Sequence, residues 1–179
     1  MTRLIFLAAL LMFSIHCGDG SLGAETTSAP SGTRCAKGRD GAHVVVRVSD
    51  GDTIVIRREG QKPSTVRLVG VDAPEVDGPY KRSEPGGDRS KAFVQSLLAG
   101  QSVYVEFDPA QGTTDKHGRQ LAYVYRARDC LLVNGEIIRQ GYGESYRRFR
   151  YRDKELFARY EREARSDRRG LWKEKERRR

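Results

Sequence analysis

The feature that most constrains the fold is a series of short β-branched runs separated by turn residues. Residues 43–49 and 52–58 flank Asp50-Gly51, a dipeptide typical of a β-hairpin turn. The same character recurs in three further runs, at residues 65–71, 102–107 and 120–125. Five short strands with turn signals between them predict a small sheet that closes on itself.

Helical patterns follow the third and fifth runs. Asp88 can cap a helix that ends near Leu98, and residues 134–140 form a short helix that Gly141 ends. A last helix begins near Asp153. Its apolar residues recur on one face at helical spacing: Leu156, Phe157, Tyr160 and Ala164. We therefore predict an α+β fold, a five-stranded OB-type antiparallel β-barrel with three helices.

Residues 1–23 are predicted to be a signal peptide. Arg3 precedes the apolar run 4–13, which is too short to span a bilayer. A buried helix of the mature domain is an alternative, but no capping residues or amphipathic pattern accompany the run. Lipidation at Cys17 is a second alternative, which His16 disfavours because a small residue is expected there. We expect an exported protein, secreted or periplasmic.

The rest of the chain divides by composition. Residues 24–40 are mainly small, polar and charged and are predicted to be a disordered linker. The domain occupies 41–172, and 173–179 form a basic tail. Cleavage of the signal leaves Cys35 and Cys130, which can form a disulfide in an oxidising compartment or remain free thiols.

The balance of charge favours a polyanionic partner. Lys and Arg number 33 against 24 Asp and Glu, so the formal net charge is +9 at pH 7. With 37% hydrophobic residues, the chain is too apolar for general disorder and too polar for a multi-span membrane protein. Nucleic acid and anionic surfaces both fit this charge, as does a basic surface that merely faces solvent.

Acidic side chains stand at the ends of two predicted strands. Asp52 opens the second strand, and Asp72 and Glu75 follow the third. In a small barrel such ends can meet, and two carboxylates with a backbone carbonyl make a hard oxygen site suited to Ca²⁺ or Mg²⁺. The Asp-Gly-Asp turn alone would be an ordinary hairpin, and Arg67 alone a surface charge. Their combined spacing indicates a site.

A second charged segment precedes the fifth strand and reads Asp115-Lys116-His117-Gly118-Arg119. Gly118 lets the backbone turn, and the Arg119 guanidinium could clamp a phosphate bidentately. His117 could act as a general acid or could be a solvated loop residue.

The two segments together resemble the two signatures of the staphylococcal nuclease family. The first runs from Asp50-Gly51-Asp52-Thr53 to Arg67-Leu68-x-x-Val71-Asp72-x-Pro74-Glu75, and the second is Asp115-Lys116-x-Gly118-Arg119-x-Leu121-Ala122. The likeness covers roughly residues 43–172. It implies a secreted, calcium-dependent endonuclease, a phosphodiesterase that hydrolyses DNA and RNA to 3′-phosphate products. We also expect a monomer that favours single strands and has no stable protein partner.

The resemblance also implies residue roles. The Ca²⁺ ligands would be Asp52, Asp72 and the backbone carbonyl of Ala73. Glu75 would be the general base or would orient the attacking water, and Arg67 and Arg119 would bind the phosphate and stabilise its transition state. Ala73 stands where the best-known member has Thr, a change that a backbone ligand tolerates. His117 replaces the usual Tyr, which leaves end preference and affinity open.

Substrate contacts are expected around the second segment and in the arginine-rich stretch 146–152. The predicted substrate-binding residues are Lys116, His117, Tyr146, Phe149 and Tyr151. Basic residues interleaved with aromatics suit single strands, because phosphates take the charges and bases stack on the rings. Alternatively, at least one of the three rings lies in the core. A non-catalytic OB-fold nucleic-acid-binding module is the competing function, but it has no need of all five charged site residues.

Overall fold

The computed structural model describes residues 41–78 and 82–175. The chain divides into two units, Met1–Pro30 and Ser31–Arg179, and the described residues all belong to the second. The predicted signal peptide and linker therefore lie outside the described residues, as do the last residues of the predicted tail. None of the described helices has the length and apolar character that crossing a membrane requires.

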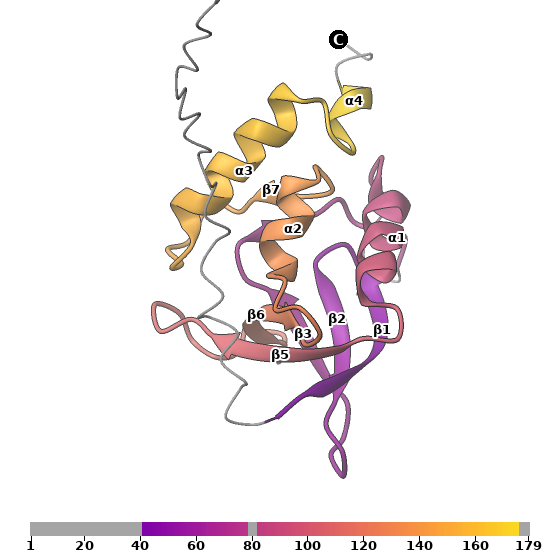
Figure 1. Cartoon of the computed structure of the whole chain (residues 1–179), viewed down its shortest axis with the longest axis vertical. Coiled ribbons are helices and arrows are strands. Elements are labelled where there is room, and N and C mark those ends of the chain that lie inside the picture. Colours follow the sequence, from indigo (N-terminus) through magenta and orange to yellow (C-terminus); the bar gives the residue numbers. More distant parts are fainter. Residues whose placement is uncertain (1–40, 79–81, 176–179) are drawn as a thin grey trace, which may run out of the picture. The chain divides into compact units, whose positions relative to one another are not determined.

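Five strands close into a barrel in the order β1-β2-β3-β6-β5 (Figure 1). They are β1 (His43–Asp50), β2 (Thr53–Arg57), β3 (Ser64–Leu68), β5 (Ser102–Phe107) and β6 (Gln120–Arg126). The predicted five-stranded barrel is confirmed, with one difference: β3 and β6 pair in parallel. An odd number of strands in a closed ring cannot alternate in direction throughout, so one parallel pair is unavoidable.

The Asp50-Gly51 hairpin is present. Asp50 pairs with Thr53, which leaves Gly51 and Asp52 as a two-residue turn between β1 and β2. The third strand is shorter than expected, because the chain turns after Leu68 and forms a separate strand, β4 (Val71–Asp72). β4 pairs antiparallel with β7 (Glu144–Ser145), a small sheet that the sequence analysis did not predict.

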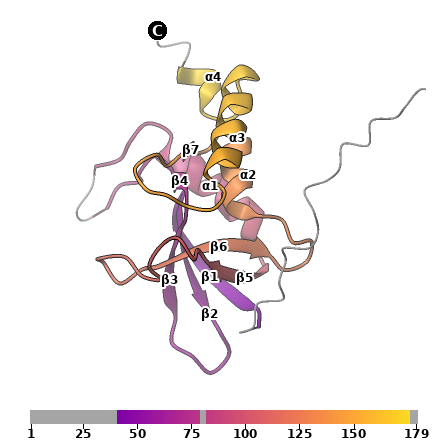
Figure 2. The same ribbon diagram turned by 90° about the vertical axis from the view of Figure 1, so that its left-hand side faces the viewer.

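The helices gather at one end of the barrel, as Figure 2 shows, around the β4–β7 pair. The three expected helices are α1 (Gly87–Leu98), α2 (Val133–Arg139) and α3 (Lys154–Ser166), and a short α4 (Trp172–Lys175) follows. Asp88 was predicted to cap α1, but it lies in the first turn. The N-cap is Gly86, which has a left-handed backbone conformation, and no side-chain hydrogen bond caps the helix.

The core fills the barrel and continues beneath the helices. Its largest fully buried side chains include Tyr123, Phe157, Ile54, Ile56 and Leu68. Buried Asn134 joins α2 to the barrel: its Nδ2 donates to the carbonyls of Val69 at 2.9 Å and Ala122 at 3.2 Å. The hydrogen bond to Val69 holds the turn that separates β3 from β4.

Cys130 follows β6 and is disulfide-bonded. The other two cysteines of the chain are Cys17 and Cys35. The disulfide partner of Cys130 therefore lies outside the described residues, and the pairing of Cys35 with Cys130 stays a prediction.

Candidate active site

Strand register brings Asp52 and Arg67 together. Thr53 pairs with Arg67 across β2 and β3, so Asp52 at the head of β2 lies beside the end of β3. Arg67 Nη2 contacts Asp52 Oδ2 at 2.8 Å, and Arg67 Nη1 donates to the Val71 carbonyl at 2.8 Å. The guanidinium is therefore held between the hairpin turn and β4.

The turn that carries Asp52 is tightly fixed. Thr53 Oγ1 donates to Asp52 Oδ1 at 2.9 Å, and the Asp52 carbonyl accepts the Leu68 N–H at 2.8 Å. A Cβ at position 51 would lie 2.0 Å from Ser90 Oγ, so only glycine allows the turn to pack this closely on α1. The carboxylate is consequently buried and has little freedom to move.

Burial dominates the electrostatics of this carboxylate. It raises the pKa of Asp52 to about 7, although the Arg67 guanidinium opposes the shift. Burial also raises the pKa of Asp72, again against the effect of Arg67. A buried carboxylate whose charge is incompletely balanced favours an added positive charge. This property fits a cation at the site.

The other predicted ligands lie close by but do not converge. The Ala73 N–H donates to Asp52 Oδ2 at 3.3 Å, whereas the Asp72 side chain is exposed on β4. Asp72 and Glu75 are near enough for their charges to interact. Within the described ranges, no three His, Cys, Asp or Glu side chains form a cluster that could hold a metal ion. The carboxylate oxygens are nevertheless the hard donors that Ca²⁺ prefers.

Arg119 is positioned by its own loop. Asp115 Oδ2 contacts Arg119 Nε at 2.7 Å, and Asp115 Oδ1 accepts the backbone N–H groups of His117 and Arg119, both at 2.9 Å. Burial acts to raise the pKa of Asp115, but these hydrogen bonds outweigh it and hold that pKa below its usual value. Among the described residues, no hydrogen bond engages the Arg119 Nη atoms, which leaves them available to an anion.

A cavity of about 710 Å³ connects the two arginines. Arg67 and Arg119 both line it. Further basic and aromatic side chains of its lining are Lys116, His117, Arg148, Arg150, Tyr146 and Phe149. Five Arg and Lys side chains and two aromatic rings thus line one cavity, together with apolar residues of β3 and the turn after it. The ring centroids of Tyr146 and Phe149 are 5.7 Å apart, and Phe149 is 61% exposed.

Comparison with known proteins agrees with this geometry. The model of the family described as "Staphylococcal nuclease homologue" matches residues 65–174. The chain is 34% identical over 132 residues to the thermonuclease of Staphylococcus intermedius, covering 74% of this chain and 70% of that protein. It is 28% identical over 171 residues to the thermonuclease of Staphylococcus hyicus, which is 94% of each chain. An uncharacterized endonuclease of Escherichia coli O157:H7 is 37% identical over 128 residues, 72% of this chain and 74% of that protein.

The chain belongs to the staphylococcal nuclease family. In this family member, Asp52 contacts both Arg67 and the Ala73 N–H, Asp72 and Glu75 are near enough for their charges to interact, and Arg67 and Arg119 line the same cavity.

One predicted substrate residue does not reach the cavity. Tyr151 is buried, its hydroxyl lies 2.8 Å from Ser145 Oγ, and its ring packs on Phe157 at 5.8 Å. The prediction that Tyr151 stacks on a base is therefore wrong, because the ring belongs to the core. Tyr146 and Phe149 do line the cavity.

The arginines of the 146–152 stretch also divide into two groups. Arg148 and Arg150 line the cavity, whereas Arg147 Nη2 contacts the buried Glu161 at 3.2 Å. Arg152 pairs with Glu106 at 2.5 Å and stacks over the Tyr123 ring. Arg147 thus joins this stretch to α3, and Arg152 joins it to the barrel.

Sequence reasoning missed two residues that shape the site. Asp115 was quoted in the motif without a role, although its spacing of four residues from Arg119 is the signal that could have found it. No sequence pattern points to Glu84, because it contacts Glu75 only across a loop.

Proposed function

We propose that this protein is an exported, calcium-dependent nuclease that hydrolyses phosphodiester bonds of DNA and RNA. Membership of a family whose relatives are named thermonuclease and endonuclease supports a nuclease. The carrying observation is that two arginines, Arg67 and Arg119, line one cavity with further basic side chains, and that Arg67 contacts the buried Asp52 carboxylate.

The arginines would act on the phosphate. A phosphodiester gains negative charge as the attacking oxygen adds, so preorganised positive charge stabilises the transition state more than the ground state. Arg67 is held by Asp52 and the Val71 carbonyl, and Arg119 by Asp115. Neither guanidinium has to reorganise when the charge develops.

A cation would be held by the carboxylates on the other side of Arg67. Asp52 and Asp72, with the carbonyl of Ala73, are the residues proposed to hold Ca²⁺. When bound, Ca²⁺ would neutralise phosphate charge and orient a water. Glu75 is proposed to accept the proton of the attacking water, which requires it to lie within hydrogen-bond reach of that water.

The substrate is proposed to be a single strand cut on the 5′-oxygen side, leaving a 3′-phosphate. Support comes from the exposed Phe149 ring beside Arg148 and Arg150, since bases can stack on the ring while phosphates meet the arginines. Lys116 and His117 are proposed to contact the strand end. The protein is proposed to act as a monomer.

Export rests on the N-terminal sequence alone. Arg3 and the apolar run after it support a cleaved signal peptide, and lipidation at Cys17 is the alternative. N-terminal sequencing of the chain recovered outside the cell distinguishes a new N-terminus near residue 24 from one at a modified Cys17.

The function is tested by incubating supercoiled plasmid and single-stranded RNA with the protein, in Ca²⁺ and in chelator. We expect degradation of both in Ca²⁺ and neither in chelator, with products that polymerase extends only after phosphatase treatment. Tight binding without cleavage would instead support a non-catalytic nucleic-acid-binding module. Cleavage in chelator would reject the calcium requirement.

A further inference from the structure

We infer that Glu84 is a positioning residue for Glu75, and that the beginning of α1 is the platform on which both carboxylate-bearing segments of the site rest. This inference rests on the proposed function of Glu75. The observations that carry it are hydrogen bonds and close contacts between segments far apart in the sequence.

Glu84 holds both main-chain groups of Glu75. The Glu75 N–H donates to Glu84 Oε2 at 3.2 Å, and the Glu84 N–H donates to the Glu75 carbonyl at 2.9 Å. These two hydrogen bonds therefore hold Glu75 and Glu84, the two ends of a loop, side by side. Because the two bonds act at opposite ends of one residue, they restrict how its backbone can rotate and hence where its side chain begins.

These two loop ends are fixed to the beginning of α1. The Gly87 N–H donates to the Glu84 carbonyl at 3.0 Å. A Cβ at position 87 would lie 2.2 Å from the Glu75 carbonyl oxygen, so the first residue of the helix is in direct contact with Glu75. A side chain at position 87 would force the proposed base away from the helix.

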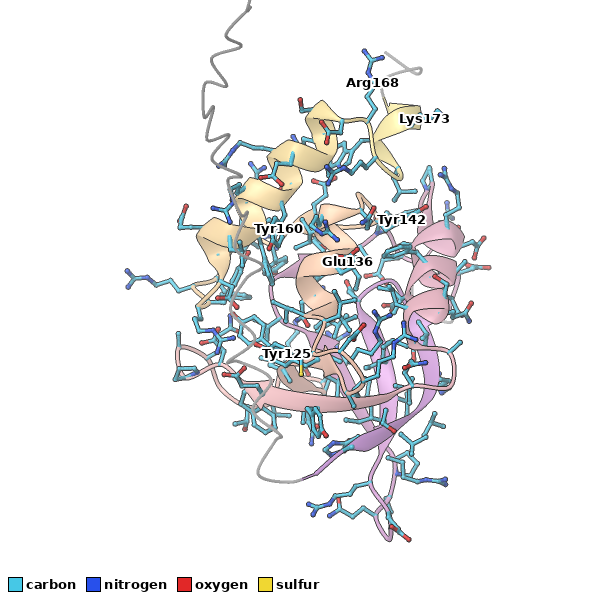
Figure 3. The ribbon with its side chains drawn as sticks, in the orientation of Figure 1. Tyr125, Glu136, Tyr142, Tyr160, Arg168 and Lys173 are labelled. Atoms are coloured by element: carbon cyan, nitrogen blue, oxygen red, sulfur yellow. The ribbon has the colours of Figure 1, made fainter. Side chains whose placement is uncertain are left out.

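The same helix supports the turn that carries Asp52. Gly51 packs on Ser90, one helical turn after Gly87, and also on Ala73. Ser90 Oγ donates to the Tyr142 carbonyl at 2.5 Å, and the Tyr142 ring stacks on Phe93 with centroids 4.2 Å apart. Figure 3 shows Tyr142 between α2 and α1. Ser90 thus joins the Asp52 turn and the segment after α2 to one helix, and this helix sets the spacing between the Asp52 turn and Glu75.

Glu84 could act by its charge instead, because its carboxylate is near enough to Asp72 to influence it. Two substitutions separate the roles. Glu84→Gln keeps an oxygen that accepts the Glu75 N–H but removes the charge, whereas Glu84→Ala removes both. Glu59→Ala, in the exposed β2–β3 turn, is the matched control for loss of a surface carboxylate.

The experiment measures amide hydrogen exchange at Glu75 by NMR without metal, and kcat and KM for a single-stranded oligonucleotide in Ca²⁺. In Glu84→Ala we expect exchange at the Glu75 amide to speed up and kcat to fall, each roughly tenfold, while KM changes less than about twofold. Glu84→Gln and Glu59→Ala should stay within about twofold of the wild type on every measure.

Wild-type exchange and kcat in Glu84→Ala would overturn the inference. So would Glu84→Gln impaired as strongly as Glu84→Ala, since that result assigns the effect to charge. Failure of the proposed function looks different. In that case the wild type is inactive, or Glu75→Gln is as active as the wild type, while the exchange measurement still reports on the Glu84 contact.

Discussion

Two carboxylate–arginine pairs contribute their arginines to the same cavity but are built in different ways. Asp52 and Arg67 come from neighbouring strands, and their side chains are only 5% and 17% exposed. Asp115 and Arg119 lie four residues apart in one loop, with side chains 15% and 31% exposed. Burial raises the pKa of Asp52, whereas hydrogen bonds lower that of Asp115. The first pair therefore depends on the whole barrel, and the second depends mainly on its own loop.

Removal of each arginine should have the largest effect and should show the difference between the two pairs. Loss of one preorganised charge typically costs 10²–10³ in rate, so Arg67→Ala and Arg119→Ala should both lower kcat by roughly that factor. Only Arg67→Ala leaves a buried carboxylate without its partner, and it should lower the free energy of unfolding by about 3 kcal/mol. Steady-state kinetics and urea unfolding measure the two effects, with exposed Arg128→Ala as the control.

Equal losses of stability in the two arginine variants would contradict the difference in construction. A change confined to KM would mean that the arginines only hold the substrate.

The aromatic residues provide a second contrast, between Phe149 at the cavity and Tyr151 in the core. Phe149→Ala should weaken single-strand DNA binding without Ca²⁺ by roughly 1–3 kcal/mol and leave stability unchanged, if a base stacks on the ring. Tyr151→Ala should instead lower the free energy of unfolding by about 3 kcal/mol, because it empties a core position. Fluorescence anisotropy and thermal unfolding separate these outcomes. Unchanged binding by Phe149→Ala would remove that ring from the interface.

Asp115→Ala tests whether the loop positions Arg119. The variant loses the contact to Arg119 Nε and two backbone hydrogen bonds, and we expect kcat to fall roughly tenfold, about 1.4 kcal/mol, with little loss of stability. The pKa of Asp115 is lower in the folded than in the unfolded protein. Its contribution to folding stability is therefore fully present above the unfolded pKa of about 4 and is lost as pH falls through the folded pKa. A kcat equal to wild type at neutral pH would reject the positioning role.

The smallest effect concerns salt. If Arg148 and Arg150 neutralise phosphates, the double variant Arg148→Ala/Arg150→Ala should flatten the log–log salt dependence of single-strand binding by about 1.4, or roughly 0.7 for each arginine. Arg147→Ala should change the slope less, because that guanidinium pairs with Glu161. Binding is measured without Ca²⁺ across a salt series. An unchanged slope in the double variant would mean that neither arginine neutralises a phosphate of the bound strand.

Much of the fold could be predicted from local patterns. The β-branched runs and the Asp50-Gly51 turn defined the barrel, and the odd strand count already required a parallel pair. The β4–β7 sheet could not be predicted in this way, since strands of two residues have no periodicity to detect.

The site was predictable where spacing within a motif carries the signal. Asp52, Arg67 and Arg119 belong to two such motifs; the two arginines line one cavity, and Asp52 contacts Arg67. Tyr151 was misassigned because alternating arginines and aromatics do not indicate which ring faces the core, a choice that depends on packing against Phe157. Glu84 is nine residues from Glu75, and only the folded loop brings the two together.

We propose that the buried Asp52 carboxylate belongs to a cation site that activity requires. Isothermal titration calorimetry with Ca²⁺, on the wild type and on Asp52→Asn, tests it most directly. We expect one Ca²⁺ site in the wild type and none, or a much weaker one, in the variant. Equal Ca²⁺ binding by both proteins, or a wild type that binds no Ca²⁺ under conditions where it digests nucleic acid, would contradict the claim.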